Sequence, residues 1–181
     1  NARDPVSRNL AKKHENSHII WFEKTKGTVK HTRAIIHEDA ISAVMALASF
    51  LKLPVQKTRL AIQAFSGLPG RMELIAEKGG VRYYNDTCAT IPDATVFAIQ
   101  TIKAQNPRSP IILIAGGSDK GLTYSPLARI IKKYCAHIII YKGTPRDKAS
   151  DKLLAELQKI RAKNIYTGNT LKKSVAQAAQ R

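Results

Sequence analysis

Residues Gly67–Asp93 read GLPGRMELIAEKGGVRYYNDTCATIPD, and this stretch decides how the rest of the chain is organised. It predicts a turn that ends at Arg71, a strand over Met72–Glu77, a turn over Lys78–Gly80 and a second strand over Val81–Tyr84. A polar loop then leads into a helix. The stretch therefore predicts a β-hairpin followed directly by a strand-to-helix connection.

The polar loop Asn85–Thr90 is a candidate ligand site. Open α/β sheets bind ligands where a strand ends and the next helix begins. The first N–H groups of such a helix also favour an anion. The alternative is an ordinary connection in which Asp86 or Thr90 caps the helix.

Beyond this loop the sequence alternates regularly between helices and strands. The expected helices are 92–104, 126–134, 151–161 and 171–179, and the expected strands are 111–115, 137–141 and 164–166. From Met72 onward the order is β-β-α-β-α-β-α-β-α, which predicts an α/β fold with a doubly wound sheet. The loops Asn85–Thr90 and Gly116–Gly121 then lie at the carboxyl ends of strands.

The chain before the hairpin has a different character. Apolar residues recur at helical spacing in Glu38–Leu51, and a second helix is expected over Val55–Phe65. The apolar segment His18–Phe22 predicts a short strand, and Thr28–Ile36 suggests one or two more. Residues 1–17 are polar and basic.

Composition narrows the class of protein. The 181 residues suffice for one domain, or for one domain and part of another. No apolar run is long enough to cross a bilayer, so we expect no membrane partner. Cys88 and Cys135 are the only cysteines and form no metal-binding or disulfide pattern, which favours a reducing, cytoplasmic setting.

The net charge of +17 raises the alternative of a non-catalytic, basic nucleic-acid-binding module. The basic residues, however, are spread along the chain, and no basic run is interleaved with aromatic residues. We therefore favour an ordinary basic, soluble surface, or one that attracts phosphorylated small molecules, over one that binds nucleic acid.

The two loops offer groups for an anionic small molecule with a polar handle. Lys120 can hold a carboxylate or phosphate, and Arg71 offers a planar fork for either. Asp86 can accept hydrogen bonds from sugar hydroxyls, and Thr90 stands at the helix start. The sequence has no Walker A loop and no nucleophile with a readable partner base. We therefore predict neither a catalytic residue nor a metal site.

At these residues the chain resembles the Mur ligase family, the ATP-dependent amide-forming enzymes of peptidoglycan synthesis. The resemblance rests on Gly67–Arg71, on Asn85–Thr90, and on Gly116–Gly121 followed by Ser125–Leu127. The three segments occur in the family's order and with similar spacing. Together they are specific, although each alone is weak.

The resemblance implies a layout and a set of binding residues. Residues 1–66 resemble the end of the central ATP-binding domain, and residues 67–181 resemble the C-terminal, Rossmann-like domain that binds the amino acid. Arg71 matches a position at the phosphates of ATP, and Asp86, beside Asn85, matches one at the ribose. Thr90 and Lys120 match positions that bind the carboxylates of D-glutamate. ATP and Mg²⁺ are the implied cofactors, with the main metal ligands outside this chain.

Some positions depart from the family pattern. The family often has His-Asn-x-x-Asn where this chain has His37–Ile41, which removes the asparagines near adenine. Cys88 stands where D-glutamate ligases commonly have a lysine. Pro92 and Asp93 resemble the proline-containing pattern that sister ligases for other amino acids have at this position.

The resemblance implies a fragment of a ligase that adds D-glutamate to UDP-N-acetylmuramoyl-L-alanine through an acyl phosphate. The phosphate-binding loop is expected before Asn1, and the segment that completes the amino-acid pocket after Arg181. We therefore expect a monomer that is inactive alone. The alternatives are a sister Mur or folylpolyglutamate-type ligase for another amino acid, the basic binding module, or an enzyme remnant with a regulatory role.

Overall fold

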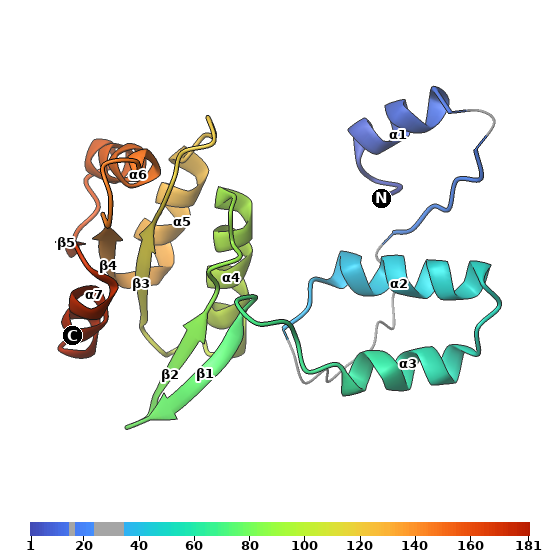
Figure 1. Ribbon diagram of the computed structural model, residues 1–181, viewed down its shortest axis with the longest axis horizontal. Coiled ribbons are helices and arrows are strands. Elements are labelled where there is room, and N and C mark those ends of the chain that lie inside the picture. The colour runs from blue at the N-terminus through green and yellow to red at the C-terminus, as the bar shows by residue number, and fades with distance from the viewer. Residues whose placement is uncertain (15–16, 24–34) are drawn as a thin grey trace. The chain divides into compact units, whose positions relative to one another are not determined.

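The computed structural model describes residues 1–14, 17–23 and 35–181. It divides into two compact units, Asn1–Asn85 and Asp86–Arg181. Figure 1 labels the helices and strands of both units. The predicted domain boundary between residues 66 and 67 stays a prediction.

The first unit opens with helix α1, Pro5–Lys12, which the sequence reasoning missed. Its start has a readable signal, because Asp4 caps it and Pro5 takes the first helical position. The hydroxyl of Ser7 and its backbone N–H both donate to Asp4 Oδ2, at 2.5 and 2.7 Å, and these two hydrogen bonds lower the pKa of Asp4.

The strand expected over His18–Phe22 is wrong, since these residues have no regular secondary structure. Within the described ranges, their backbone is joined to another segment by one hydrogen bond, from the N–H of Ala2 to the carbonyl of Phe22 at 2.7 Å. A lone bond does not make a sheet. Most of the expected strand region 28–36 lies outside the described residues.

Two helices follow as expected, α2 over Glu38–Phe50 and α3 over Val55–Ala64. They contact each other, and α2 buries Ile41 and Ala48. Lys52 follows α2 with a φ of 54°, a left-handed conformation that favours glycine. The N–H of Leu53 reaches back to the carbonyl of Ala48 at 2.9 Å and closes the helix end.

The hairpin is confirmed. Strand β1, Glu73–Lys78, pairs antiparallel with β2, Val81–Asn85, and the two form a sheet of their own. The turn residues Gly79 and Gly80 have φ values of 60° and 76°, which suit a tight hairpin turn. At the open end of the hairpin Glu73 stands opposite Asn85.

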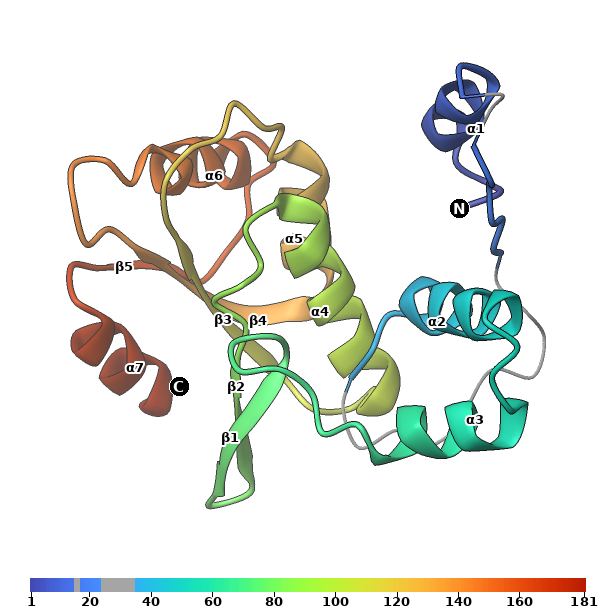
Figure 2. The same cartoon turned by 45° about the vertical axis from the view of Figure 1, so that its right-hand side comes forward.

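The second unit contains the predicted alternation of helices and strands. Its elements are α4 (Pro92–Gln105), β3 (Ile111–Gly116), α5 (Ser125–Tyr134), β4 (Cys135–Tyr141), α6 (Lys148–Lys159), β5 (Ile165–Gly168) and α7 (Leu171–Ala179). The strands form a parallel sheet in the order β3-β4-β5. Figure 2 shows α4, α5 and α6 on one side of this sheet and α7 on the other. The α/β, doubly wound fold is thus confirmed.

The sheet register aligns the carboxyl ends of its three strands. Gly116 is paired with Tyr141, and Tyr141 with Gly168. The loops that leave these residues therefore start from one row. The loop 85–90 instead follows β2, which belongs to the hairpin, so the strand-end argument holds within the parallel sheet only for the loop after β3.

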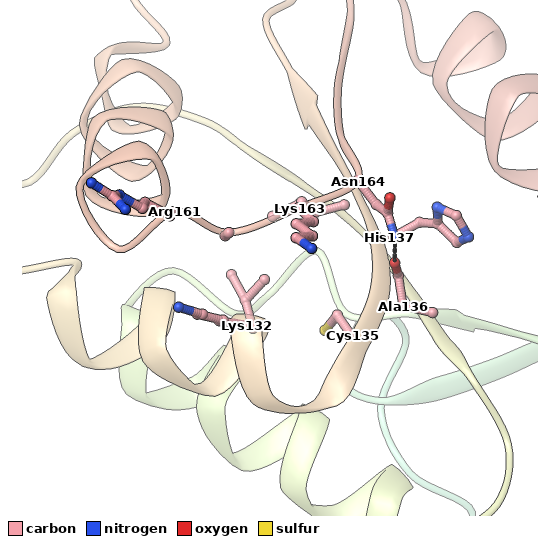
Figure 3. A pocket seen from close by; sticks show the side chains of 10 residues that line it. Lys132, Cys135, Ala136, His137, Arg161, Lys163 and Asn164 are labelled. Carbon is pink, nitrogen blue, oxygen red and sulfur yellow. Dashed lines mark hydrogen bonds between the residues drawn. The ribbon is translucent and has the colours of Figure 1, made fainter.

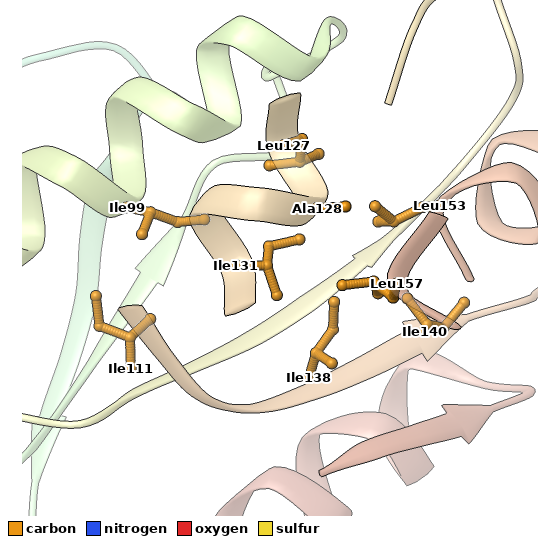
Figure 4. Close-up of a cluster of buried hydrophobic side chains, with 9 residues drawn as sticks. All are labelled: Ile99, Ile111, Leu127, Ala128, Ile131, Ile138, Ile140, Leu153 and Leu157. Atoms are coloured by element: carbon orange, nitrogen blue, oxygen red, sulfur yellow. The ribbon is translucent and has the colours of Figure 1, made fainter. Parts of the chain in front are cut away.

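The core of the second unit lies between the sheet and its three-helix face. Ile138 and Ile140 of β4 pack there against Leu127, Ala128 and Ile131 of α5, and Leu153 and Leu157 of α6 complete the cluster (Figure 4). Ile139, between the two β4 residues, is fully buried on the opposite face, as alternation along a strand requires. Each fully buried isoleucine contributes about 1.5–3 kcal/mol, so this core fixes the strands that carry the loops.

Among the described helices, none is long and apolar enough to cross a membrane.

Candidate functional site

The loop after β3 begins where two strands and a helix meet. A Cβ on Gly116 would lie 2.2 Å from the carbonyl oxygen of Tyr141, so only glycine fits. The buried hydroxyl of Ser150, on α6, donates to that same carbonyl at 2.7 Å. It also accepts the N–H of Gly117 at 3.3 Å. The first residues of the loop are therefore held on β4 and α6.

Asp119 anchors the middle of this loop. Its carboxylate pairs with Lys152 of α6 at 2.5 Å and accepts the N–H of Gly121 at 3.1 Å. The Tyr124 hydroxyl donates to it at 3.3 Å. These partners, led by Lys152, lower the pKa of Asp119. Burial, together with the nearby carboxylate, raises the pKa of Tyr124.

Lys120 lies between the anchored residues and is exposed. Among the described residues none forms an ion pair with it, whereas its neighbour Asp119 is already neutralised by Lys152. The loop therefore presents Lys120 as a positive charge toward solvent at the carboxyl end of the sheet. This is the arrangement expected for a side chain that binds a carboxylate or phosphate.

The N-cap residue of α4 is Ile91, which makes no side-chain capping bond, and Pro92 takes the first helical position. Neither Asp86 nor Thr90 is therefore the N-cap residue of this helix. Thr90 is exposed just before the helix start. This helix start lies at the same end of the unit as the loop after β3 (Figure 1), although no recorded hydrogen bond joins Thr90 to Lys120.

Arg71 and Asn85 belong to the first unit, where Glu73 organises the turn that carries the arginine. The Glu73 carboxylate accepts the N–H of Gly70 at 2.8 Å and the side-chain amide of Asn85 at 3.2 Å. Gly70 and Met72, on either side of Arg71, have φ values of 72° and 47°. Such a bend exposes the Arg71 side chain. Asp86, Thr90 and Lys120 lie in the second unit.

The structure adds residues that the sequence reasoning did not single out. Asp147 shapes the loop after β4 by accepting the N–H groups of Gly143 and Thr144, each at 2.8 Å. An open groove of about 570 Å³ includes Lys142, which directly follows β4, and Lys173 of α7 in its lining. The pattern Gly-Thr-Pro-Arg-Asp after a buried strand is a signal that could have identified Asp147.

The described cysteines and acidic residues form neither a disulfide nor a metal site. Cys88 and Cys135 form no disulfide. Burial raises the pKa of the Cys135 thiol to about 12, so it stays protonated near neutral pH. Within the described ranges no group of three or more His, Cys, Asp and Glu residues could hold a metal ion.

Comparison with known proteins identifies the family of this chain. The family description "Mur ligase, glutamate ligase domain" matches residues 70–181. The UDP-N-acetylmuramoylalanine–D-glutamate ligase of Roseiflexus sp. (strain RS-1) is 40% identical over 108 residues, which cover 60% of this chain and 22% of the relative. The ligase of the same name from Caldicellulosiruptor bescii is 30% identical over 164 residues, covering 87% of this chain and 34% of the relative.

Solved structures agree on the fold. Folylpolyglutamate synthase of Mycobacterium tuberculosis, solved with ADP and AMPPCP, matches with a TM-score of 0.62 and 17% sequence identity. The match covers 79% of this chain and 32% of that protein. The chain thus spans about a fifth to a third of the length of these proteins.

Proposed function

This chain belongs to the Mur ligase family, and from that premise we propose that it carries the amino-acid-binding domain of an ATP-dependent ligase. The ligase adds D-glutamate to UDP-N-acetylmuramoyl-L-alanine in the cytoplasm. Residues 67–181 form the amino-acid-binding domain, and residues 1–66 form the end of the central ATP-binding domain. The names of the relatives from Roseiflexus and Caldicellulosiruptor bescii support this choice of amino acid.

The proposal rests on Lys120, which is exposed and forms no ion pair with a described residue. Asp119 is neutralised by Lys152 and tied to the loop backbone, so it does not compete for the lysine beside it. Lys120 therefore keeps its charge available for an incoming carboxylate. The start of α4, whose N-cap residue Ile91 makes no side-chain capping bond, offers a second group for a carboxylate, with Thr90 just before it.

The proposed roles of the remaining residues concern the nucleotide. Arg71, exposed on its turn, contacts the phosphates of ATP, and Asn85 and Asp86 lie toward the ribose. The hydrogen bonds that Glu73 accepts from Gly70 and Asn85 support this assignment, because they hold the Arg71 turn and the end of β2 together.

The reaction in the whole enzyme has two steps. The γ-phosphate of ATP passes to the carboxylate of UDP-N-acetylmuramoyl-L-alanine and leaves an acyl phosphate and ADP. The amine of D-glutamate then attacks the acyl carbon. The C–N bond forms, the bond to phosphate breaks and the amine loses a proton. In this chain Lys120 and Thr90 position the amino acid, so its contribution to the rate is orientation.

A magnesium ion, when bound, supplies positive charge at the phosphates. The described residues include no cluster of acids and histidines that fits such an ion, so we assign it no ligand in this chain.

The test measures phosphate release from ATP by the complete product of the gene that encodes this sequence. UDP-N-acetylmuramoyl-L-alanine is supplied, with and without D-glutamate. We expect release that requires D-glutamate. Lys120→Ala and Thr90→Ala should raise the KM for D-glutamate by about tenfold or more, equal to about 1.4 kcal/mol of lost binding. The matched control is Lys172→Ala, an exposed lysine on α7 without a recorded ion pair.

Two other outcomes lead elsewhere. Release that requires a different amino acid, or a folate acceptor, would keep the family and change the substrate to that of a sister or folylpolyglutamate-type ligase. Absence of any ATP turnover would contradict the proposed reaction and favour the binding-module alternative.

A further inference from the structure

The second unit has a basic edge opposite the candidate site. We use this name for seven residues in the last turns of α4, α5 and α6 or between those helices and the strands that follow them: Lys103, Arg108, Lys132, Lys133, Lys159, Arg161 and Lys163. One acid lies among these segments, Glu156, and it is paired with Lys159 at 2.6 Å. The unit's other acids lie at the opposite end: Asp86, Asp93, Asp119, Asp147 and Asp151. The basic edge is therefore almost without acids, whereas basic and acidic residues are mixed at the opposite end.

A cavity of about 400 Å³ opens within the basic edge. Lys132, Arg161 and Lys163 lie around it, and its lining includes no acidic residue. Figure 3 shows these three side chains on one side of β4, whereas the ring of His137 points to the other side. Ile131, Ile138 and Ala162 contribute apolar lining. The volume is within the range of small-ligand pockets.

Hydrogen bonds between the segments around this cavity hold its lining residues in place. The side-chain amide of Asn164 donates to the carbonyl of Ala136 at 2.9 Å, and the N–H of Ile138 donates to the carbonyl of Asn164 at 3.0 Å. Lys132 Nζ donates to the carbonyl of Ile160 at 2.6 Å. That bond offsets part of the negative end of α6 and leaves the ammonium two further protons.

Arg161 occupies a position where the backbone favours glycine. It follows the end of α6 with a φ of 52°. Its N–H bonds to the carbonyl of Gln158, and the N–H of Ala162 to that of Leu157, each at 2.9 Å. These bonds define a Schellman motif, in which glycine is the usual residue. Local backbone preference therefore does not explain an arginine here.

The helix dipole explains only part of the basic edge. Lysines in a last helical turn suit the negative end of the dipole, and Lys103, Lys132 and Lys159 are in such turns. Arg161 and Lys163 lie beyond the end of α6, in the connection to β5. Their charge adds to that of Lys132 around the same cavity.

We propose that this cavity binds a phosphate group of a phosphate-bearing ligand, between Lys132, Arg161 and Lys163. Arginine can hold two phosphate oxygens at once, and the lysines add point charges. The site lies at the edge opposite the proposed substrate site and does not depend on the proposed ligase reaction. The phosphate comes either from a small phosphate ester or from a nucleic-acid backbone.

The experiment titrates the 181-residue chain, in low salt, with inorganic pyrophosphate and separately with a single-stranded oligothymidylate. Backbone amide resonances of residues 160–164 are followed by NMR. We expect them to shift with saturation. The variant Arg161→Gly/Lys163→Gln should weaken binding at least tenfold, whereas the control Lys148→Gln/Lys172→Gln, with the same loss of charge, should change it less than twofold. Arg161→Gly alone should raise Tm while weakening binding, which a purely structural role of Arg161 would not do.

The two ligands distinguish the sources of the phosphate. Oligothymidylate that binds more tightly than pyrophosphate, with a steep loss of affinity as salt rises, identifies a nucleic-acid backbone. Equal or tighter binding of pyrophosphate identifies a small phosphate ester. Absence of saturable shifts at residues 160–164, or equal weakening by the two double variants, would overturn the proposal, because attraction would then follow net charge alone.

Discussion

Lys152 Nζ lies 2.5 Å from Asp119 Oδ2, and this ion pair ties the loop after β3 to helix α6. The two residues are far apart in sequence, and the pair is half-shielded, with 17% of the Asp119 side chain exposed. It leaves the adjacent Lys120 without an acid partner among the described residues. The loop is therefore both held in place and positively charged.

The first prediction concerns pH. Lys152 lowers the pKa of Asp119 below its ordinary value of 3.8. A carboxyl with a lowered folded-state pKa stabilises the fold above its unfolded-state value, and this contribution is lost as the pH falls through the folded-state pKa. Asp119→Asn should therefore lower the free energy of unfolding at neutral pH, and the difference from wild type should shrink below about pH 4. Urea unfolding across this range measures it.

Lys152→Met is the counterpart of that variant. It removes the same ion pair from the other side and should show the same narrowing with acid. A difference from wild type that stays constant from neutral pH to below about pH 3 would contradict the assignment of the stability to this pair.

The second prediction concerns Gly116. An added Cβ would meet the backbone carbonyl of Tyr141 at 2.2 Å, and backbone of a central strand cannot move aside cheaply. Gly116→Ala should cost at least about 2 kcal/mol of unfolding free energy, within the range for overpacking. Gly80→Ala is the control: nothing lies within 4 Å of its Cβ position, and its φ of 76° alone costs about 1–2 kcal/mol. Chemical denaturation measures the unfolding free energy of each variant. Equal losses of unfolding free energy in Gly116→Ala and Gly80→Ala would argue against the steric account.

The third prediction concerns Ser150, whose buried hydroxyl joins the carbonyl of Tyr141 to the N–H of Gly117. Ser150→Ala leaves two backbone groups short of a partner and should cost about 1–3 kcal/mol. Ser109→Ala, at an exposed position, should change stability by no more than about 0.5 kcal/mol. Denaturant midpoints measure both, and a neutral Ser150→Ala would show that the hydroxyl does not bridge the loop to the sheet.

The fourth prediction concerns Lys52, which follows α2 with a φ of 54°. Lys52→Gly relieves this left-handed strain and should raise stability by about 1 kcal/mol. Ala61→Gly, at an exposed position inside α3, should lower it by about 1 kcal/mol, because glycine weakens a helix interior. Thermal unfolding compares the two, and a destabilising Lys52→Gly would refute the strain argument.

The fifth prediction rests on the proposed ATP contact of Arg71. Glu73→Ala removes the acceptor that holds Gly70 and Asn85. In the complete enzyme it should raise the KM for ATP by about tenfold and leave the KM for D-glutamate within about twofold. Glu77→Ala, on the same strand and exposed, is the matched control. A larger effect on D-glutamate than on ATP would reassign the Arg71 turn.

The sequence alone determined most of the local structure. Apolar runs such as Ile111–Ala115 and helical spacing such as that after Glu38 predicted elements within a few residues of their observed bounds. Gly79-Gly80 predicted the hairpin turn, and three short segments indicated the family, because these signals lie within a few consecutive residues. The failures were at weak signals. The strand at His18–Phe22 has no partner strand among the described residues, and α1 was missed although Asp4 and Pro5 mark its start.

Only the tertiary structure decided how these elements meet. The pairing of Asp119 with Lys152, the bridge through Ser150, and the common row of Gly116, Tyr141 and Gly168 each join residues from different elements. The gathering of Lys132, Arg161 and Lys163 around one cavity is of the same kind. Such contacts depend on sheet register and helix packing, which many sequences satisfy with different residues, so no local pattern predicts them.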